Sequence, residues 1–180
     1  MNETPAHYTR TAIALHWVLA LMIFIAFPVG LYMVDLRLSP EKLQLYSWHK
    51  WAGIAILVLA LIRLLWRATH RPPALPASMK RIEQIAAHAA HHLLYVLMIA
   101  VPLVGWMMSS AKGFPVVWFG LVPLPDLVSK NKELGDLLGE VHELLAWGMA
   151  LIVIAHAAAA IKHHFLARDG ILARMLPFLK

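Results

Sequence analysis

The sequence predicts an all-α membrane protein in which four transmembrane helices form one bundle. Hydrophobic residues make up 61% of the 180 residues, well above the roughly 45–50% of an average soluble domain. They are concentrated in four segments that are almost free of charge, and each reaches the roughly 20 residues that a helix needs to cross a bilayer. We expect helices at about residues 11–34, 48–68, 84–109 and 141–165, in a single domain that covers residues 1–180.

The four segments differ in how clearly they predict a membrane helix. Thr11 to Val34 has no Asp, Glu, Lys or Arg, and its uncharged run exceeds the 7–15 residues of a typical signal-peptide core. We therefore expect it to be retained rather than cleaved. The second segment, Trp51 to Trp66, is the shortest and carries one charge, Arg63. Ile85 to Ala111 and Leu144 to Ile161 carry no charge.

The positive charges indicate the orientation of the bundle. With an even number of helices, both termini and the proline-rich connection at residues 69–81 lie on one side of the membrane, which carries ten cations and three acids. The other side carries six cations and seven acids. Because an excess of Lys and Arg marks the cytoplasmic side, we expect cytoplasmic termini. The charges on the terminal side are Arg10, Arg63, Arg67, Arg71, Lys80, Arg81, Lys162, Arg168, Arg174 and Lys180, with Glu3, Glu83 and Asp169.

This distribution also bears on the partners of the chain. The net charge of +6 lies largely beside the lipid headgroups, which favours the bilayer over nucleic acid as the partner of these cations. The longest loop, Lys112 to Glu140, contains the apolar stretch GFPVVWFGLVPLP, which is too short and too rich in proline to span. We expect it at the outer interface with Trp118 at headgroup depth, either as a packed loop or as a cap over a site.

The chain has eleven histidines and no cysteine. Without cysteine it has no disulfide, no thiolate-bound iron–sulfur cluster and no covalent haem attachment motif. His142 and His156 stand fourteen residues apart in the fourth helix. At the period of about 3.5 residues in a left-handed bundle this interval is four full turns, so both share one face at depths about 21 Å apart. A histidine inside a membrane is costly without a partner.

The other helices supply a partner at each depth. The first helix enters from the terminal side, so His16 lies level with His156, and the second enters from the opposite side, so His49 lies level with His142. A lone histidine is more simply explained by a hydrogen bond to a backbone carbonyl, but two pairs matched by depth favour metal ligation. Haem fits better than zinc, which usually takes four protein ligands. The sequence thus predicts two b-type haems enclosed by the bundle.

Further residues recur at the same interval. Gly30, Arg63 and Gly105 each follow a histidine by fourteen residues. The two glycines would leave room for a porphyrin at the outer depth, although glycine also helps membrane helices to pack. Arg63 would reach the inner depth, where a haem propionate offsets the cost of a charge in the membrane.

Other histidines lie near the cytoplasmic end. The third helix supplies three alternative ligands of the inner haem, His88, His91 and His92. Of these, His91 is the best candidate because it shares a face with Gly105. Otherwise these residues line the edge of the haem or a ligand pocket. His163 continues the ligand face of the fourth helix toward the interface. There it would hydrogen-bond a quinone carbonyl or a haem propionate and carry a proton, or it would simply lie among headgroups.

The motifs together resemble the prokaryotic cytochrome b561 family. They are ALHW, WHKWAGIAILVLALIRLLWR, AHAAHHLLYVLMIAVPLVGW and VHELLAWGMALIVIAHAAAAIKHHF, which cover nearly the whole chain. The resemblance implies His16, His49, His142 and His156 as iron ligands and electron transfer between the two membrane faces, with ubiquinone as partner. Some members of this family oxidise superoxide at the outer face.

Alternative functions stay open. A membrane-anchoring cytochrome b subunit would relay electrons from a partner dehydrogenase or hydrogenase, and a haem-free transporter or metal carrier would use the histidines differently. Lys112, Lys130 and Lys132 would attract superoxide to the outer mouth, but the same loop carries four acids. The sequence does not indicate an oligomeric state.

Overall fold

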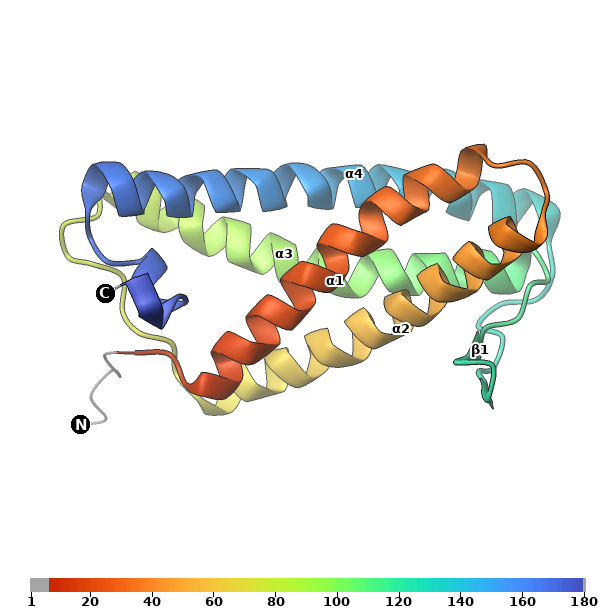
Figure 1. Ribbon diagram of the computed structural model, residues 1–180, viewed down its shortest axis with the longest axis horizontal. Helices are drawn as coiled ribbons and strands as arrows, with labels where there is room; N and C mark the ends of the chain where they lie inside the picture. Colours follow the sequence, from red (N-terminus) through yellow and green to blue (C-terminus); the bar gives the residue numbers. More distant parts are fainter. Residues whose placement is uncertain (1–6, 180) are drawn as a thin grey trace.

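The computed structural model describes residues 7–179 and contains four long helices in this part of the chain (Figure 1). The helices are α1 (Arg10–Asp35), α2 (Pro40–Thr69), α3 (Arg81–Ala111) and α4 (Lys132–Lys162). All four are long and apolar enough to cross a membrane, which confirms the predicted four-helix membrane bundle. Glu3 and Lys180, which contribute to the charge count above, lie outside the described residues.

Two helices begin before the spans expected from hydropathy. α2 begins at Pro40 and α4 at Lys132, each preceded by a capping side chain. The hydroxyl of Ser39 accepts a backbone N–H of the first turn of α2 at 3.2 Å, and the carboxamide of Asn131 accepts one of α4 at 3.0 Å. Such caps satisfy backbone donors that have no partner within the helix. The polar first turns therefore extend both helices beyond their apolar stretches.

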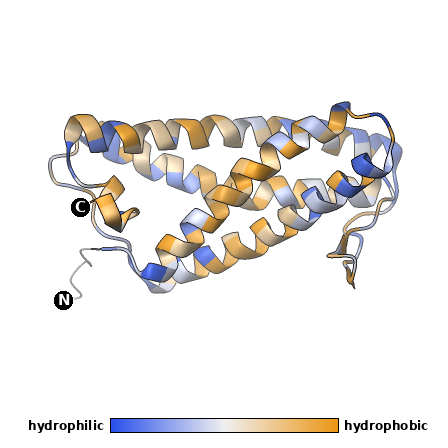
Figure 2. Ribbon diagram, viewed as in Figure 1, coloured by the Kyte–Doolittle hydropathy of each residue, from blue (hydrophilic) through white to orange (hydrophobic). Residues whose placement is uncertain are grey.

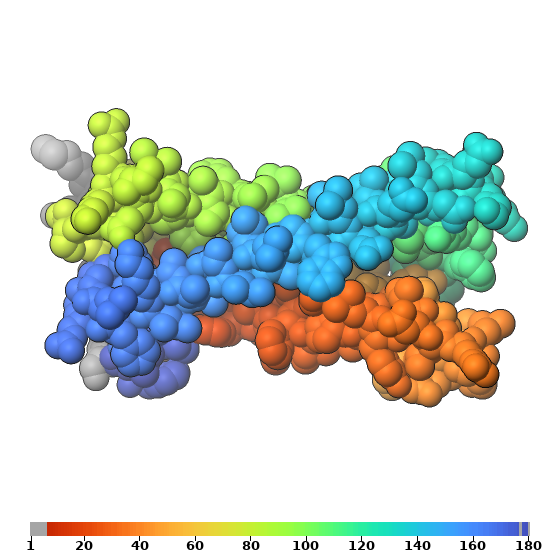
Figure 3. All heavy atoms as spheres, turned by 90° about the horizontal axis from the view of Figure 1, so that it is seen from above, coloured from red at the N-terminus to blue at the C-terminus, as the bar shows by residue number. Residues whose placement is uncertain are grey.

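The helices run between two distinct ends of the molecule. Both termini lie at one end, called here the terminus end, and the strands β1 (Val117–Trp118) and β2 (Val122–Pro123) lie at the other, called the hairpin end (Figure 1). The closely packed pairs are α3 with α4, α1 with α2, and α2 with α3. In the space-filling view the surface of α4 lies between those of α3 and α1 (Figure 3). Among the described residues, α4 does not pack closely against α1 or α2, and side chains bridge these gaps.

An apolar core fills the middle of the bundle, between the depths of the two predicted histidine pairs. Its buried residues are Leu19, Ile23, Ile56, Ala60, Leu97, Met98, Val101 and Met149. Many large apolar side chains point outward instead, including Phe24 and Leu151, which are 77% and 64% exposed. Figure 2 shows the hydrophobic colouring along all four helices. This outward apolar surface is what a bilayer requires, because lipid takes the place of water around the helices.

The loop at the hairpin end packs against α2. β1 and β2 form an antiparallel pair, and two tryptophans fix it to the bundle. The indole N–H of Trp51 donates to the carbonyl of Val117 at 2.7 Å, and that of Trp118 donates to the carbonyl of Trp51 at 3.2 Å.

The C-terminal segment folds back over the terminus end. α4 continues into a π-helical turn, η1 (His163–Ala167), after which the chain reverses through Arg168 and Gly170, with φ of 53° and 75°. The short helices η2 (Leu172–Arg174) and η3 (Pro177–Leu179) follow. The indole N–H of Trp17 in α1 donates to the carbonyl of Met175 at 2.8 Å and so holds this segment against the bundle.

Candidate haem sites

At the hairpin end, His49 of α2 faces His142 of α4. The centres of the two rings lie 6.2 Å apart, with ring planes at 83°. Nδ1 of His142 lies 3.0 Å from the carbonyl oxygen of Val101 in α3, which accepts the Nδ1 proton. This hydrogen bond leaves the lone pair on Nε2, the tautomer that metal-binding histidines use.

The second ring of this pair is held less firmly, with the backbone of Ala26 in α1 near it but outside good hydrogen-bond geometry. Nδ1 of His49 is the one buried side-chain nitrogen or oxygen in residues 7–179 without a hydrogen-bond partner. A buried polar atom that makes no hydrogen bond costs about 1–3 kcal/mol. Through this nitrogen the protein therefore orients His49 less firmly than it orients His142.

Two glycines make room for these two rings. A Cβ atom placed on Gly30 would lie 3.1 Å from Cε1 of His49, and one placed on Gly105 would lie 2.9 Å from Cε1 of His142. Both distances are shorter than ordinary carbon–carbon contacts of about 3.5–4.0 Å. Gly30 and Gly105 thus lie at the depth that the sequence predicts, and what they directly accommodate is the imidazole rings.

At the terminus end, His16 of α1 faces His156 of α4. Their ring centres lie 6.1 Å apart, with ring planes at 70°. A third ring, His91 of α3, lies 5.3 Å from His156, so it remains close to this pair. The other two α3 histidines are exposed, and Nδ1 of His92 lies 2.7 Å from the carbonyl oxygen of His88.

Arg63 of α2 reaches the terminus-end pair. Its Nη1 lies 2.9 Å from Nδ1 of His16, and its Nε–H donates to the hydroxyl of Tyr95 at 3.1 Å. A guanidinium only donates, so in this contact Nδ1 of His16 accepts and the ring proton is on Nε2. If Nε2 of His16 binds iron, the proton moves to Nδ1 and Arg63 needs another acceptor, for which a haem propionate is suited.

The spacing and the donor set of the two pairs fit haem. Two imidazoles on opposite faces of one metal ion have ring centres about 6–6.5 Å apart, given metal–nitrogen bonds of roughly 2 Å. The observed 6.2 and 6.1 Å match this spacing. Within the described residues no cluster of three or more His, Cys, Asp or Glu side chains suits a bare metal ion. Haem therefore fits best, because its porphyrin supplies the remaining ligands of the iron. The helices that carry each pair are not closely packed, which leaves space for it.

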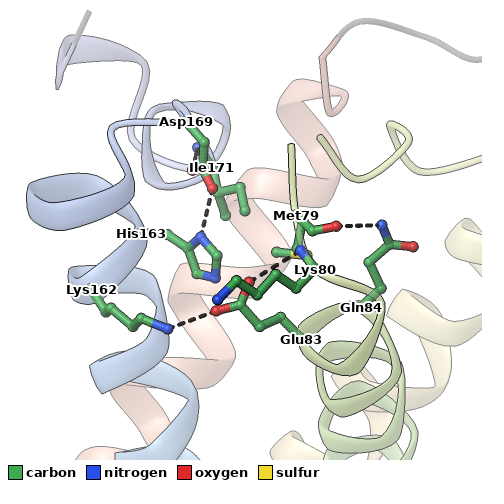
Figure 4. Close-up of polar contacts among 8 residues, drawn as sticks. All are labelled: Met79, Lys80, Glu83, Gln84, Lys162, His163, Asp169 and Ile171. Carbon is green, nitrogen blue, oxygen red and sulfur yellow. Dashed lines mark hydrogen bonds and ion pairs between the residues drawn. The ribbon is translucent and has the colours of Figure 1, made fainter. Parts of the chain in front are cut away.

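His163 is buried at the terminus end and paired with an acid that the sequence analysis did not single out. Its Nδ1 lies 2.6 Å from Oδ2 of Asp169, with side-chain exposures of 10% and 6% (Figure 4). Asp169 also accepts the backbone N–H of Ile171 at 3.2 Å, and Lys162 pairs with Glu83 at 2.7 Å. The Asp–Gly pair after the fourth helix is a turn signal, and this turn brings Asp169 back onto His163.

The family to which these features belong is settled by sequence similarity over almost the whole chain. The model of the family described as prokaryotic cytochrome b561 matches residues 7–178. The chain belongs to the prokaryotic cytochrome b561 family. As a cytochrome b561, it is a membrane electron-transfer protein, and the family implies b-type haem as its cofactor.

The similarity to individual relatives extends over nearly the full length of both chains. The chain is 33% identical to "Cytochrome b561 homolog 2" of Escherichia coli strain K12 over 182 residues, which is 97% of this chain and 94% of the relative. It is 34% identical to "Probable superoxide oxidase CybB" of Yersinia pestis over 176 residues, 94% of this chain and 96% of the relative. It is 27% identical to "Cytochrome b562" of Cereibacter sphaeroides, over 98% of each chain. The predicted cytochrome b561 identity is confirmed.

Proposed function

We propose that this cytochrome b561 carries single electrons across the membrane through two b-type haems. His49 and His142 hold one haem, and His16 and His156 hold the other. The observation that carries the proposal is that α4 contributes one histidine to each of two opposed pairs, with ring centres 6.2 and 6.1 Å apart. When bound, b-type haem accepts and donates one electron at a time, at a potential set by its ligands, burial and nearby charge.

The chain's own residues hold and separate the two sites. The carbonyl of Val101 orients His142, and Gly30 and Gly105 let the hairpin-end imidazoles approach the neighbouring helices. The fourteen residues between His142 and His156 correspond to about 21 Å of helix, most of the roughly 30 Å hydrocarbon core. The apolar core between the pairs excludes water from the space between the sites.

The electron donor that we favour is superoxide at the hairpin end, and the acceptor is ubiquinone. The name of the Yersinia pestis relative supports this donor. Two superoxide anions are oxidised to two O₂ molecules, and the two electrons, with two protons, convert ubiquinone to ubiquinol. The charge asymmetry supports an orientation with the termini in the cytoplasm, the hairpin end outside and a bacterial inner membrane between them.

The structure bears on both ends of this route. At the hairpin end, Lys112 and Lys132 lie 3.6 and 3.0 Å from the carboxylate of Asp136, so they offer superoxide less positive charge than their number suggests. At the terminus end, His163 has one nitrogen on Asp169 and uses the other to hydrogen-bond a quinone carbonyl and pass it a proton. The carboxylate of Asp169 accepts the Nδ1 proton and orients the ring, and Nε2 donates to the quinone carbonyl when the imidazole carries its second proton.

Superoxide and ubiquinone, added to the purified protein without any partner subunit, test this function. We expect superoxide to reduce the bound haem, as seen in its visible spectrum, and added ubiquinone to reoxidise it with formation of ubiquinol. Reduction only in the presence of a dehydrogenase or hydrogenase would identify a membrane-anchoring cytochrome subunit instead. A purified protein without b-type haem absorbance would point to a haem-free transporter or carrier.

A further inference from the structure

A small cleft at the terminus end adjoins the His16–His156 pair, whose neighbour Arg63 lines it. It is lined by the start of α1 and the two residues before it, by the end of α2 and the residues that follow it, by Tyr95 of α3 and by Met175 of the C-terminal segment. Its volume of about 30 Å³ is too small for a quinone ring. A cavity of that size admits a small polar group, since a single water needs about 10–15 Å³ by the same measure.

Three arginines at the end of α2 and just after it line this cleft. Arg63 and Arg67 lie four residues apart on one face of α2, and Arg71 follows two residues after the helix ends at Thr69. The like charges of Arg63 and Arg67 at this spacing repel each other and destabilise the helix. Among residues 7–179, no acidic side chain lines the cleft to offset them.

In the part of the chain that the structure describes, Arg67 and Arg71 have no carboxylate partner. None of the ion pairs found within residues 7–179 involves Arg63, Arg67 or Arg71. Arg63 donates to His16 and Tyr95 instead, as described above. The guanidinium carbon of Arg67 lies 5.8 Å from the centre of the Tyr95 ring, over its face. Arg67 and Arg71 therefore remain available to an anion that enters from outside the protein.

Polar and aromatic contacts fix the wall of the cleft. The indole N–H of Trp66 donates to the hydroxyl of Thr9 at 2.9 Å and so ties α2 to the start of α1. The ring of His70 stacks on Trp66 with centres 3.9 Å apart and planes at 4°. Tryptophan and tyrosine gather where a membrane meets water, so Trp66 and Tyr8 indicate that the cleft opens at headgroup depth.

We propose that this cleft binds a phosphoryl oxyanion, the phosphate of an anionic phospholipid headgroup, between Arg67 and Arg71. The planar guanidinium matches two phosphate oxygens at once, and a basic cleft between membrane helices is the kind of site that anionic headgroups occupy. The small volume admits the phosphate while the acyl chains stay in the bilayer. Inorganic phosphate offers the same oxyanion without the chains, so the experiment separates the two sources.

The test measures lipid binding by the purified holoprotein. Titration with phosphatidylglycerol, followed by native mass spectrometry, is compared between wild type, Arg67→Gln/Arg71→Gln and a control that loses the same charge, Arg10→Gln/Arg81→Gln. Arg10 and Arg81 are exposed at the same end but do not line the cleft. We expect one saturable phosphatidylglycerol per wild-type chain, at least tenfold weaker binding in the cleft variant, and wild-type affinity in the control.

Several outcomes decide the proposal. Equal weakening in the two double variants would overturn it in favour of diffuse attraction by surface charge, and so would unchanged binding in the cleft variant. Inorganic phosphate that binds wild type at millimolar concentration and displaces phosphatidylglycerol supports the oxyanion site and assigns its ligand to a soluble source. If the double variant loses its helical circular dichroism, Arg71→Gln alone, at an exposed position after the end of α2, is expected to weaken binding at least threefold. A fully retained affinity in that variant would contradict the assignment.

Discussion

A single methyl group at Gly105 tests the fit of the hairpin-end site. In Gly105→Ala the new Cβ would lie 2.9 Å from Cε1 and 3.0 Å from Nδ1 of His142. Restoring an ordinary carbon–carbon contact of about 3.5–4.0 Å requires the ring to move by about 0.6–1.1 Å. Such a movement lengthens the 3.0 Å contact with the carbonyl of Val101 and displaces the proposed ligand atom.

The expected cost follows from these distances. Overpacking a well-filled site destabilises it by about 1–3 kcal/mol. The better helix propensity of alanine offsets at most ~1 kcal/mol of this free energy. We therefore expect haem at the hairpin end to bind roughly tenfold more weakly, which corresponds to about 1.4 kcal/mol. The terminus-end haem should be unaffected, because none of its proposed ligands contacts Gly105.

The measurement is the ratio of haem to protein after purification and extraction of the haem, together with the visible spectrum of the reduced protein. Gly148→Ala is the matched control, because a Cβ at Gly148 of the same helix as His142 would meet nothing within 4 Å. We expect Gly148→Ala to keep two haems and Gly105→Ala to lose part of one. Identical haem content and spectra in the two variants would refute the reasoning that Gly105 exists to accommodate a ligating imidazole.

Two further substitutions test the terminus end. Arg63→Gln removes a positive charge beside His16, so the midpoint potential of one haem should fall by ~60 mV in a redox titration while that of the other stays constant. An equal shift of both midpoint potentials would contradict the placement of Arg63. Asp169→Asn weakens a charge-assisted hydrogen bond to His163, so ubiquinone reduction should slow by about tenfold at unchanged haem content. A wild-type rate in steady-state ubiquinol formation would remove His163 from the quinone site.

Much of the fold follows from the sequence because the bilayer imposes few solutions. The charge-free segments at Thr11–Val34 and Ile85–Ala111 had to be helices, since lipid offers no partner for an unpaired backbone group. The starts of α2 and α4 were missed because their first turns are polar and depend on the caps Ser39 and Asn131. Hydropathy does not register such turns.

The histidine pairs follow from helical period and chain direction alone, and the structure brings these residues together as expected. What surrounds them does not follow, because it depends on how helices cross and where the chain reverses. The carbonyl of Val101 and the hydroxyl of Tyr95 reach the sites from α3 at angles that no periodicity specifies. Asp169 meets His163 only because the chain turns back after η1. The ring of His91 lies 5.3 Å from His156, a proximity that depends on how α3 crosses α4 and not on the helical period.

The pairing of ligands is the central claim, and haem analysis of four single variants tests it most directly. The haem-to-protein ratio and the reduced spectrum would be measured for alanine substitutions of His49, His142, His16 and His156. We predict that His49→Ala and His142→Ala lose the same haem and share one residual spectrum, while His16→Ala and His156→Ala share the other. Two haems retained in any of these variants, or matching spectra in His49→Ala and His16→Ala, would contradict the account.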